Sequence, residues 1–206
     1  MDEIEKLTGF FHEVGKLKEV KRQGWVVAGI KDCESAAEHS FRFAVMSMIL
    51  GRDTGIDVCK AVRMGLVHDI AEARIGDIIT WKSFHMDDKS KQDKERAAMV
   101  SMTAPLGDVG KEMLSLWEEF EAGKTSEARF SREIDKLEMV FQAFEYERDR
   151  TGLNDAINTF YESDDHSAGA VKGPELRRFV ERIMAMRHKL GYDAEGRYPE
   201  RGAADK

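Results

Sequence analysis

The stretch VHDIAE at residues 67–72 brings one imidazole and two carboxylates close together, those of His68, Asp69 and Glu72. We expect this stretch to end a helix that spans about residues 56–74. Because an α-helix turns about 100° per residue, the three side chains fall within one arc of roughly 100°. The same arc carries apolar and small residues, namely Val58, Ala61, Val62 and Gly65. The pattern therefore predicts that the three ionisable groups face the interior of the protein.

The cations of this predicted helix do not lie on that arc. Lys60, Arg63 and Arg74 project to the opposite side, toward solvent. A buried carboxylate without a partner carries a penalty of several kcal/mol, and a bound divalent metal would offset that penalty. An ordinary ion pair on the helix surface is the alternative for His68-Asp69, but the inward arc and the nearby Glu72 favour a site.

A metal needs ligands from other segments, and two residues qualify. His39 lies on a helix that we predict from the capping box Ser35–Glu38 to Leu50; a core histidine is the alternative. Asp135 lies on a helix predicted over residues 126–149, on a face of uncharged and small groups, and a solvated or paired aspartate is the alternative there. The remaining histidines have no partner at ligand spacing, which predicts a single metal: His12, His85, His166 and His188.

Apolar residues repeat every three or four positions along most of the chain, which predicts an all-α fold. Helices are expected near residues 3–20, 35–50, 56–74, 89–103, 108–121, 126–149, 154–161 and 174–190. Loops are expected near residues 21–33, 81–88 and 164–173. We therefore predict a single-domain helical bundle over residues 1–190 and a polar, flexible tail over residues 191–206.

The composition of the 206-residue chain narrows the class of protein. Lys and Arg number 32 against 39 Asp and Glu, which gives a net charge of −7. No basic excess is present to bind a nucleic acid polymer, although a small phosphate ligand held by a few cations stays open. Cys33 and Cys59 are too few and too far apart for a disulfide framework. The longest apolar stretch, residues 43–50, is too short to span a membrane, so we expect a cytoplasmic protein.

His39, the His68-Asp69 pair and Asp135, each on its own predicted helix, form a pattern that resembles the HD-domain metal-dependent phosphohydrolases. The resemblance covers roughly residues 5–190 and implies an HD-type helical bundle. Finer motifs are similar to the 5′-deoxynucleotidase branch of that family: Gly24-Trp25, Glu34-Ser35, Glu38-His39-Ser40, residues 67–72 and Gly76-Asp77-Ile78.

The resemblance implies a role for each of these residues. One divalent metal is implied, with His39, His68, Asp69 and Asp135 as its ligands. These residue types suit Mn²⁺, Co²⁺, Fe²⁺, Zn²⁺ or Mg²⁺ and do not choose among them. Glu72 is implied as the catalytic carboxylate.

The resemblance also implies a nucleoside pocket lined by Trp25 and Asp77, with the indole packing where a 2′-hydroxyl would sit. In the bacterial relatives an arginine directly before the tryptophan binds phosphate, and Gly24 occupies that position here. We expect Arg22 to reach the phosphate instead.

The implied activity is hydrolysis of 5′-deoxynucleoside monophosphates to deoxynucleoside and phosphate, by a homodimer. Our hypothesis is that a water activated by the metal attacks phosphorus in line, opposite the 5′-oxygen. Glu72 would orient that water or manage the proton of the leaving group. Two alternatives stay open: another nucleotide phosphohydrolase on the same scaffold, acting on a triphosphate or an alarmone, and a non-catalytic helical scaffold that holds a structural metal.

Overall fold

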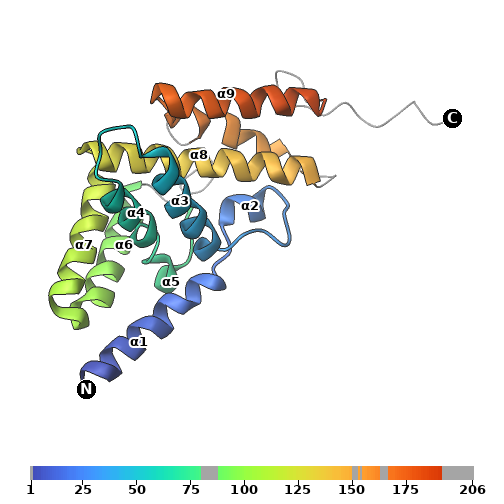
Figure 1. Ribbon diagram of the computed structural model, residues 1–206. Helices are drawn as coiled ribbons and strands as arrows, with labels where there is room; N and C mark the ends of the chain where they lie inside the picture. The colour runs from blue at the N-terminus through green and yellow to red at the C-terminus, as the bar shows by residue number, and fades with distance from the viewer. Residues whose placement is uncertain (1, 80–87, 150–152, 154, 163–166, 192–206) are drawn as a thin grey trace. The chain divides into compact units, whose positions relative to one another are not determined.

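The computed structural model describes residues 2–79, 88–149, 153, 155–162 and 167–191, and within these ranges it is helical (Figure 1). The described residues contain no strand, and their one isolated bridge joins Lys21 to Ser35. The all-α prediction is confirmed. None of the helices in these ranges combines the length and the apolar character needed to cross a membrane.

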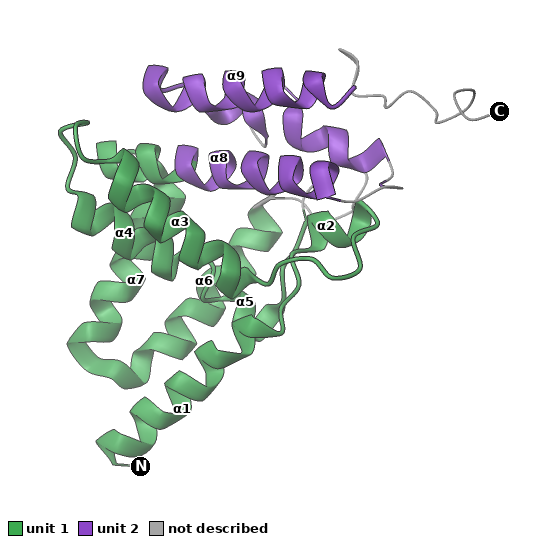
Figure 2. Ribbon diagram, turned by 45° about the vertical axis from the view of Figure 1, so that its right-hand side comes forward, with its two compact units in different colours: residues 1–132 green, residues 133–206 purple. Residues whose placement is uncertain are grey.

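The chain divides into two compact units, residues 1–132 and 133–206 (Figure 2). The single domain over residues 1–190 with a tail over 191–206 stays a prediction, and residues 192–206 lie outside the described ranges. The first unit contains α1 (Glu3–Gly15), η1 (Lys16–Lys18), α2 (Gln23–Val27), α3 (Ala36–Leu50), α4 (Val58–Val67), α5 (Glu72–Ile75), α6 (Asp88–Thr103), η2 (Ala104–Leu106) and α7 (Gly107–Ala122). The boundary falls within α8 (Ser126–Asp149), which is followed by η3 (Asp155–Tyr161), η4 (Ala168–Ala170) and α9 (Pro174–Lys189).

Most of the predicted helices are confirmed, with ends that differ by a few residues. The segment 3–20 forms α1 and then the short 3₁₀ helix η1, whereas 154–161 is 3₁₀ rather than α-helical. The loop predicted at 21–33 is wrong in part, because it contains α2. The loop predicted at 164–173 likewise contains η4. The loop predicted at 81–88 lies outside the described residues except for the start of α6.

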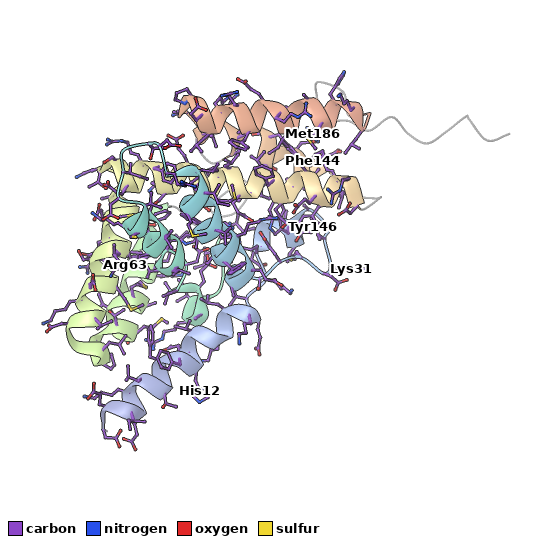
Figure 3. The ribbon with its side chains drawn as sticks, viewed as in Figure 1. His12, Lys31, Arg63, Phe144, Tyr146 and Met186 are labelled. Carbon is purple, nitrogen blue, oxygen red and sulfur yellow. The ribbon has the colours of Figure 1, made fainter. Side chains whose placement is uncertain are left out.

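The helix α1 begins with a capping box, in which the Asp2 side chain accepts from the Glu5 amide and the Glu5 carboxylate accepts from the Asp2 amide, both at 2.8 Å. Its apolar stripe stays largely exposed: Ile4 is 75% and Phe11 65% accessible. His12 is also exposed on this helix (Figure 3). The stripe of α1 therefore adds little to the core of the first unit.

The helix α3 begins at the predicted capping box. The Ser35 hydroxyl accepts from the Glu38 amide at 3.3 Å, and the Glu38 carboxylate accepts from the Ser35 amide at 2.6 Å. The hydrogen bonds that the Glu38 carboxylate accepts from Ser35 lower its pKa, and the bond from the backbone amide has the larger effect. The capping box fixes the start of the helix at Ala36, three residues before the fully buried His39.

Close approach of α3 to α4 depends on Gly65. A Cβ atom at Gly65 would lie 2.8 Å from Cδ2 of Phe43, which is itself fully buried. The centroid of the Phe43 ring is 4.8 Å from that of His68. Glycine at this position therefore lets one aromatic ring pack against α4 and against the imidazole at its end.

The single helix predicted over 56–74 is wrong in its extent, because α4 ends at Val67 and α5 begins at Glu72. Between them the amides of Ile70 and Glu72 donate to carbonyls three residues earlier, at 3.2 and 3.0 Å. Such turns are tighter than those of an α-helix and advance about 120° per residue. The segment 68–71 thus turns more sharply than the predicted helix would.

The cations of this segment point away from the histidine and carboxylates, as predicted, but they are paired. Lys60 contacts Glu119 at 2.7 Å, and Arg63 contacts Glu112 at 2.5 Å, which attaches α4 to α7 (Figure 3 labels Arg63). Arg74 contacts Glu13 of α1 at 2.6 Å. These ion pairs hold the outer side of α4 and α5, so their charges are not available to the inner side.

The second unit is held together by a buried ion pair between its longest helices. Arg187 of α9 contacts Glu147 of α8 at 2.7 Å, and both side chains are at most 5% exposed. The Tyr161 hydroxyl donates to the same carboxylate at 2.8 Å, and its ring lies 3.9 Å from the guanidinium. Because every polar partner is satisfied by another, this cluster can stay buried.

We expect Gly65→Ala to destabilise the protein by about 1–3 kcal/mol, because the added methyl group must displace the fully buried ring of Phe43. The free energy of unfolding by urea measures the effect. Gly9→Ala is the matched control, since nothing lies near a Cβ there and the helix should gain about 0.5–1 kcal/mol. Equal stability of the two variants would contradict the packing described for Phe43.

Candidate metal centre

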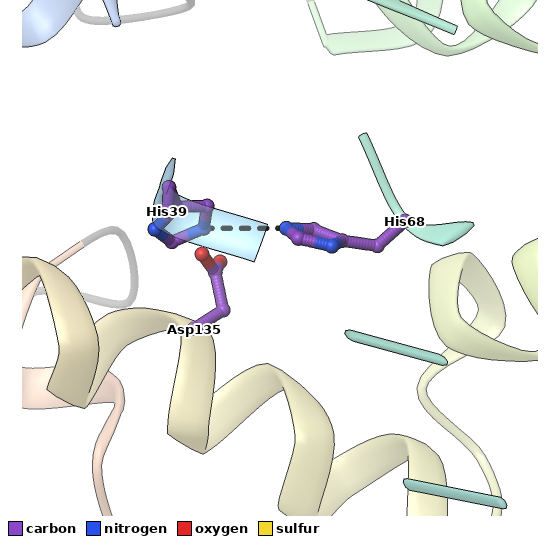
Figure 4. A group of neighbouring side chains, drawn as sticks. All are labelled: His39, His68 and Asp135. Carbon is purple, nitrogen blue, oxygen red and sulfur yellow. Dashed lines mark hydrogen bonds between the residues drawn. The ribbon is translucent and has the colours of Figure 1, made fainter. Parts of the chain in front are cut away.

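Two imidazoles face each other in the interior of the first unit. The Nε2 atoms of His39, on α3, and His68, at the end of α4, lie 3.3 Å apart (Figure 4). The other ring nitrogen of His68, Nδ1, lies 2.9 Å from the Gly65 carbonyl oxygen. Since a carbonyl only accepts, Nδ1 donates to it, and this bond orients the ring so that Nε2 faces His39 and Asp69. A cation between the two rings would satisfy this arrangement.

The carboxylate of Asp69 supplies a third donor at the same place. Its Oδ2 lies 3.1 Å from His68 Nε2 and 3.9 Å from His39 Nε2. Two ligand atoms at right angles around an ion, each about 2.1 Å from it, lie about 3 Å apart. The spacing of His39, His68 and Asp69 therefore fits a shared ion, and two imidazoles with a carboxylate suit several divalent metals.

Arg22, the residue before α2, reaches this cluster from a distant part of the sequence. Its Nη1 lies 3.2 Å from Asp69 Oδ2. Burial alone would raise the pKa of Asp69, but His68, Arg22 and His39 together hold that pKa below its usual value. The residue predicted to bind phosphate thus lies beside a predicted metal ligand.

Glu72 is the buried carboxylate next to this cluster. It is 2% exposed, and its Oε2 has no hydrogen-bond partner among the residues that the structure describes. Burial, followed by the negative charges of Asp69 and Asp77, raises the pKa of Glu72 well above its usual value, while Arg22 and Lys91 oppose the shift. An unsatisfied buried carboxylate is costly and is typical of a functional site.

Asp77 and Trp25 meet at α2. The Asp77 Oδ2 accepts from the backbone N–H of Gln23 at 2.6 Å, which joins the segment after α5 to the start of α2. The Trp25 side chain is 1% exposed, and its indole N–H donates to Glu34 Oε1 at 2.9 Å. The structure therefore anchors both residues around the short helix that follows Arg22, and their contact with a nucleoside stays a prediction.

The fourth predicted ligand, Asp135, lies on α8 within the second unit. Its Oδ2 lies 2.9 Å from the ammonium group of Lys136. Its role as a ligand stays a prediction. Of the other histidines, His12 and His188 are exposed, and His85 and His166 lie outside the described residues.

Comparison with known proteins identifies the family. The sequence profile of the HD domain matches residues 14–171, which is most of the chain. The chain belongs to the HD domain family. The His68-Asp69 pair, with His39 facing it, agrees with the pattern expected from the sequence.

Relatives of this HD protein carry names that state an activity. The chain is 35% identical over 181 residues to human 5′-deoxynucleotidase HDDC2, and the match covers 88% of this chain and 86% of the human protein. It is 39% identical over 185 residues to the HDDC2 protein of Xenopus laevis, covering 88% of each. The yeast 5′-deoxynucleotidase YBR242W is 30% identical over 190 residues, covering 91% of this chain and 77% of the yeast protein.

Two solved structures agree with the fold. A protein of Magnetospirillum magnetotacticum, described as a predicted metal-dependent phosphohydrolase, is 28% identical with a TM-score of 0.66 and covers 91% of this chain and 92% of its own. The PH0347 protein of Pyrococcus horikoshii is 32% identical, also with a TM-score of 0.66, and covers 89% of this chain and 96% of its own.

Three charged residues near His39, His68 and Asp69 are not predicted from the sequence: Glu34, Lys91 and Glu95. Glu34 is part of the motif Glu34-Ser35, but nothing in the sequence predicts that it accepts from the indole N–H of Trp25. Lys91 and Glu95 lie on α6, whose sequence is so polar that its inner face is hard to recognise. The one available signal is that both precede the apolar positions Ala98 and Met99 at helical spacing.

We expect His68→Ala to lose at least about tenfold in affinity for Co²⁺ or Mn²⁺, because it removes a donor that the Gly65 carbonyl already orients. Isothermal titration of the purified protein with each metal measures the affinity. His12→Ala, on the exposed face of α1, should bind as the unsubstituted protein does. Equal affinity in both variants would contradict a metal site at His68.

Proposed function

We propose that the protein is a metal-dependent phosphomonoesterase that hydrolyses 5′-deoxynucleoside monophosphates to deoxynucleoside and phosphate. The observation that carries the proposal is the convergence of His39, His68 and Asp69 beside the buried Glu72, whose Oε2 has no hydrogen-bond partner among the described residues. The similarity to several relatives named 5′-deoxynucleotidase supports the same activity.

We propose that one divalent ion is held by His39, His68, Asp69 and Asp135. The approach of the first three donors in the first unit supports this set. Asp135, on α8 of the second unit, is assigned as the fourth ligand from the sequence pattern alone. The ion would supply a water of lowered pKa and offset negative charge on the phosphoryl group. Mn²⁺, Co²⁺, Fe²⁺, Zn²⁺ and Mg²⁺ all stay open as its identity.

Glu72 is the residue that we assign to the chemistry. Its Oε2 lacks a partner in the described part of the chain, so it can accept from a water or from a protonated substrate oxygen. In that position the carboxylate orients the attacking water in line with phosphorus, or transfers a proton to the leaving 5′-oxygen. A structural metal site would need no such residue, which disfavours the non-catalytic scaffold.

Substrate binding is assigned to Arg22, Trp25 and Asp77. The guanidinium of Arg22 takes a phosphate oxygen in place of the arginine that Gly24 replaces. Its position beside Asp69, at 3.2 Å, supports a place next to the reacting phosphate. Trp25 packs where a 2′-hydroxyl would sit. The Gln23 amide donates to the Asp77 carboxylate, and this hydrogen bond holds α2, which carries Trp25, in place.

The proposal extends to assembly and location. We propose a homodimer, supported by the exposed apolar side chains of Phe41, Met48 and Ile49 on α3. We propose a cytoplasmic location, because Cys33 and Cys59 are both free thiols. We also propose that residues 1–190 act as one functional domain, since the HD profile spans the boundary between the two units.

We expect the metal-loaded protein to release phosphate from 5′-deoxynucleoside monophosphates in the presence of Co²⁺ or Mn²⁺, and far less from the matching ribonucleotides. Free phosphate, measured across a panel of both kinds and of deoxynucleoside triphosphates, tests this. Release from triphosphates alone would favour the other phosphohydrolase. Release from no substrate would favour the non-catalytic scaffold.

We expect Glu72→Gln to lose at least about a hundredfold in kcat while it still binds the metal, because the amide keeps the shape but not the basicity of the carboxylate. Kinetics and elemental analysis on the same preparation measure the two properties. Glu3→Gln, in the first turn of α1, should keep full activity. Normal turnover by the Glu72 variant would reject its assigned role.

A further inference from the structure

The first turns of α6 carry two charged side chains on its inner face. Lys91 and Glu95 are half-buried, and the residues between them are exposed. The same face continues to the buried residues Ala98, Met99 and Met102. The helical register therefore directs Lys91 and Glu95 inward, along the stripe that packs against the rest of the first unit.

This inner face meets the segment that contains the proposed catalytic carboxylate. The helices α5 and α6 are in contact, and α5 begins at Glu72. The Lys91 ammonium lies 3.5 Å from Glu95 Oε1, which limits how far it can swing. The Lys91 side chain is 28% exposed, and its charge opposes the rise in the pKa of Glu72 that burial causes.

The surroundings keep Lys91 charged. Burial alone would lower its pKa, but Glu95, Glu72, Asp77 and Asp69 together raise it above the usual value. Glu95, by contrast, has its pKa raised to about 7, first by burial, and then by Glu121 and Asp69 against the effect of Lys91. Lys91 is therefore a permanent cation among carboxylates.

A substrate phosphate needs such a cation. The carboxylates of Asp69 and Asp77 would repel a phosphate group, and Lys91 would add to the positive charge that Arg22, 3.2 Å from Asp69, supplies there. A lysine ammonium is a compact charge with three donors, and it binds phosphate oxygens well. Lys91 on α6 would offset this repulsion of the phosphate group with a second positive charge, besides that of Arg22, which precedes α2.

We propose that Lys91 binds the phosphate group of the substrate, with Glu95 as a positioning residue that holds its ammonium at the inner face of α6. This assignment rests on the proposed function, since it names a contact of the same active site. It is distinct from a purely structural role, in which Lys91 would only neutralise buried carboxylates and stabilise the fold.

The test compares Lys91→Met with Lys94→Met in the metal-loaded protein. Both changes remove one positive charge from the same helix, but Lys94 is exposed. We expect Lys91→Met to weaken inhibition by inorganic phosphate at least about tenfold, because a charged hydrogen bond is lost. Inhibition by the deoxynucleoside product should change less than about twofold, and Lys91→Arg should regain part of the phosphate affinity. Lys94→Met should match the unsubstituted protein in both inhibition measurements.

Unchanged phosphate inhibition in Lys91→Met, with or without a fall in thermal stability, would overturn the assignment and leave only a structural role. Direct calorimetric binding of inorganic phosphate separates this inference from the proposed function. If the unsubstituted protein hydrolyses no monophosphate but binds phosphate through Lys91, the proposed function fails and the phosphate site stands. If it binds no phosphate at all, the assignment of Lys91 fails.

Discussion

The approach of the His39 and His68 imidazoles, with their Nε2 atoms 3.3 Å apart in the interior, is the constraint on which the first unit depends. Nδ1 of His68 donates to the Gly65 carbonyl, which orients the ring and turns Nε2 toward His39. Two ring nitrogens can approach this closely only with a proton or a cation between them, and a shared ion would serve both rings.

Each local feature of α3 and α4 serves this approach. The capping box at Ser35 fixes where α3 starts. The small Gly65 lets the Phe43 ring pack against the imidazole of His68. The tight turns after Val67 then bring Asp69 to within 3.1 Å of the His68 ring. Packing and metal binding are therefore coupled, because the same few contacts orient both ligands and helices.

Electrostatics divides the cluster into two parts. Asp69 is surrounded by His68, Arg22 and His39, which keep its pKa low, so it is an anion ready to bind a cation. Glu72 lies where burial and neighbouring carboxylates raise its pKa, so it differs from Asp69 in how readily it holds a proton. Two carboxylates of unlike proton affinity, next to each other, suit one ligand and one acid–base residue.

Local signals in the sequence were sufficient for much of this arrangement. Helical periodicity predicts α3, α6, α7, α8 and α9, and the pattern at Ser35 predicts where α3 begins. The interruption between α4 and α5 could not be predicted, because residues 67–72 contain no proline or glycine. The contact of Arg22 with Asp69 spans 47 residues, and no local pattern encodes it. Lys91 lies in the first half of α6, where residues 88–96 are all polar, so only the folded chain shows which face is the inner one.

The most direct test of the shared ion is X-ray absorption of the Co²⁺-loaded protein at the cobalt edge. We predict a first shell of nitrogen and oxygen atoms at about 2.0–2.2 Å, with the outer-shell scattering typical of two imidazoles. A shell of oxygen atoms without imidazole scattering would contradict the account.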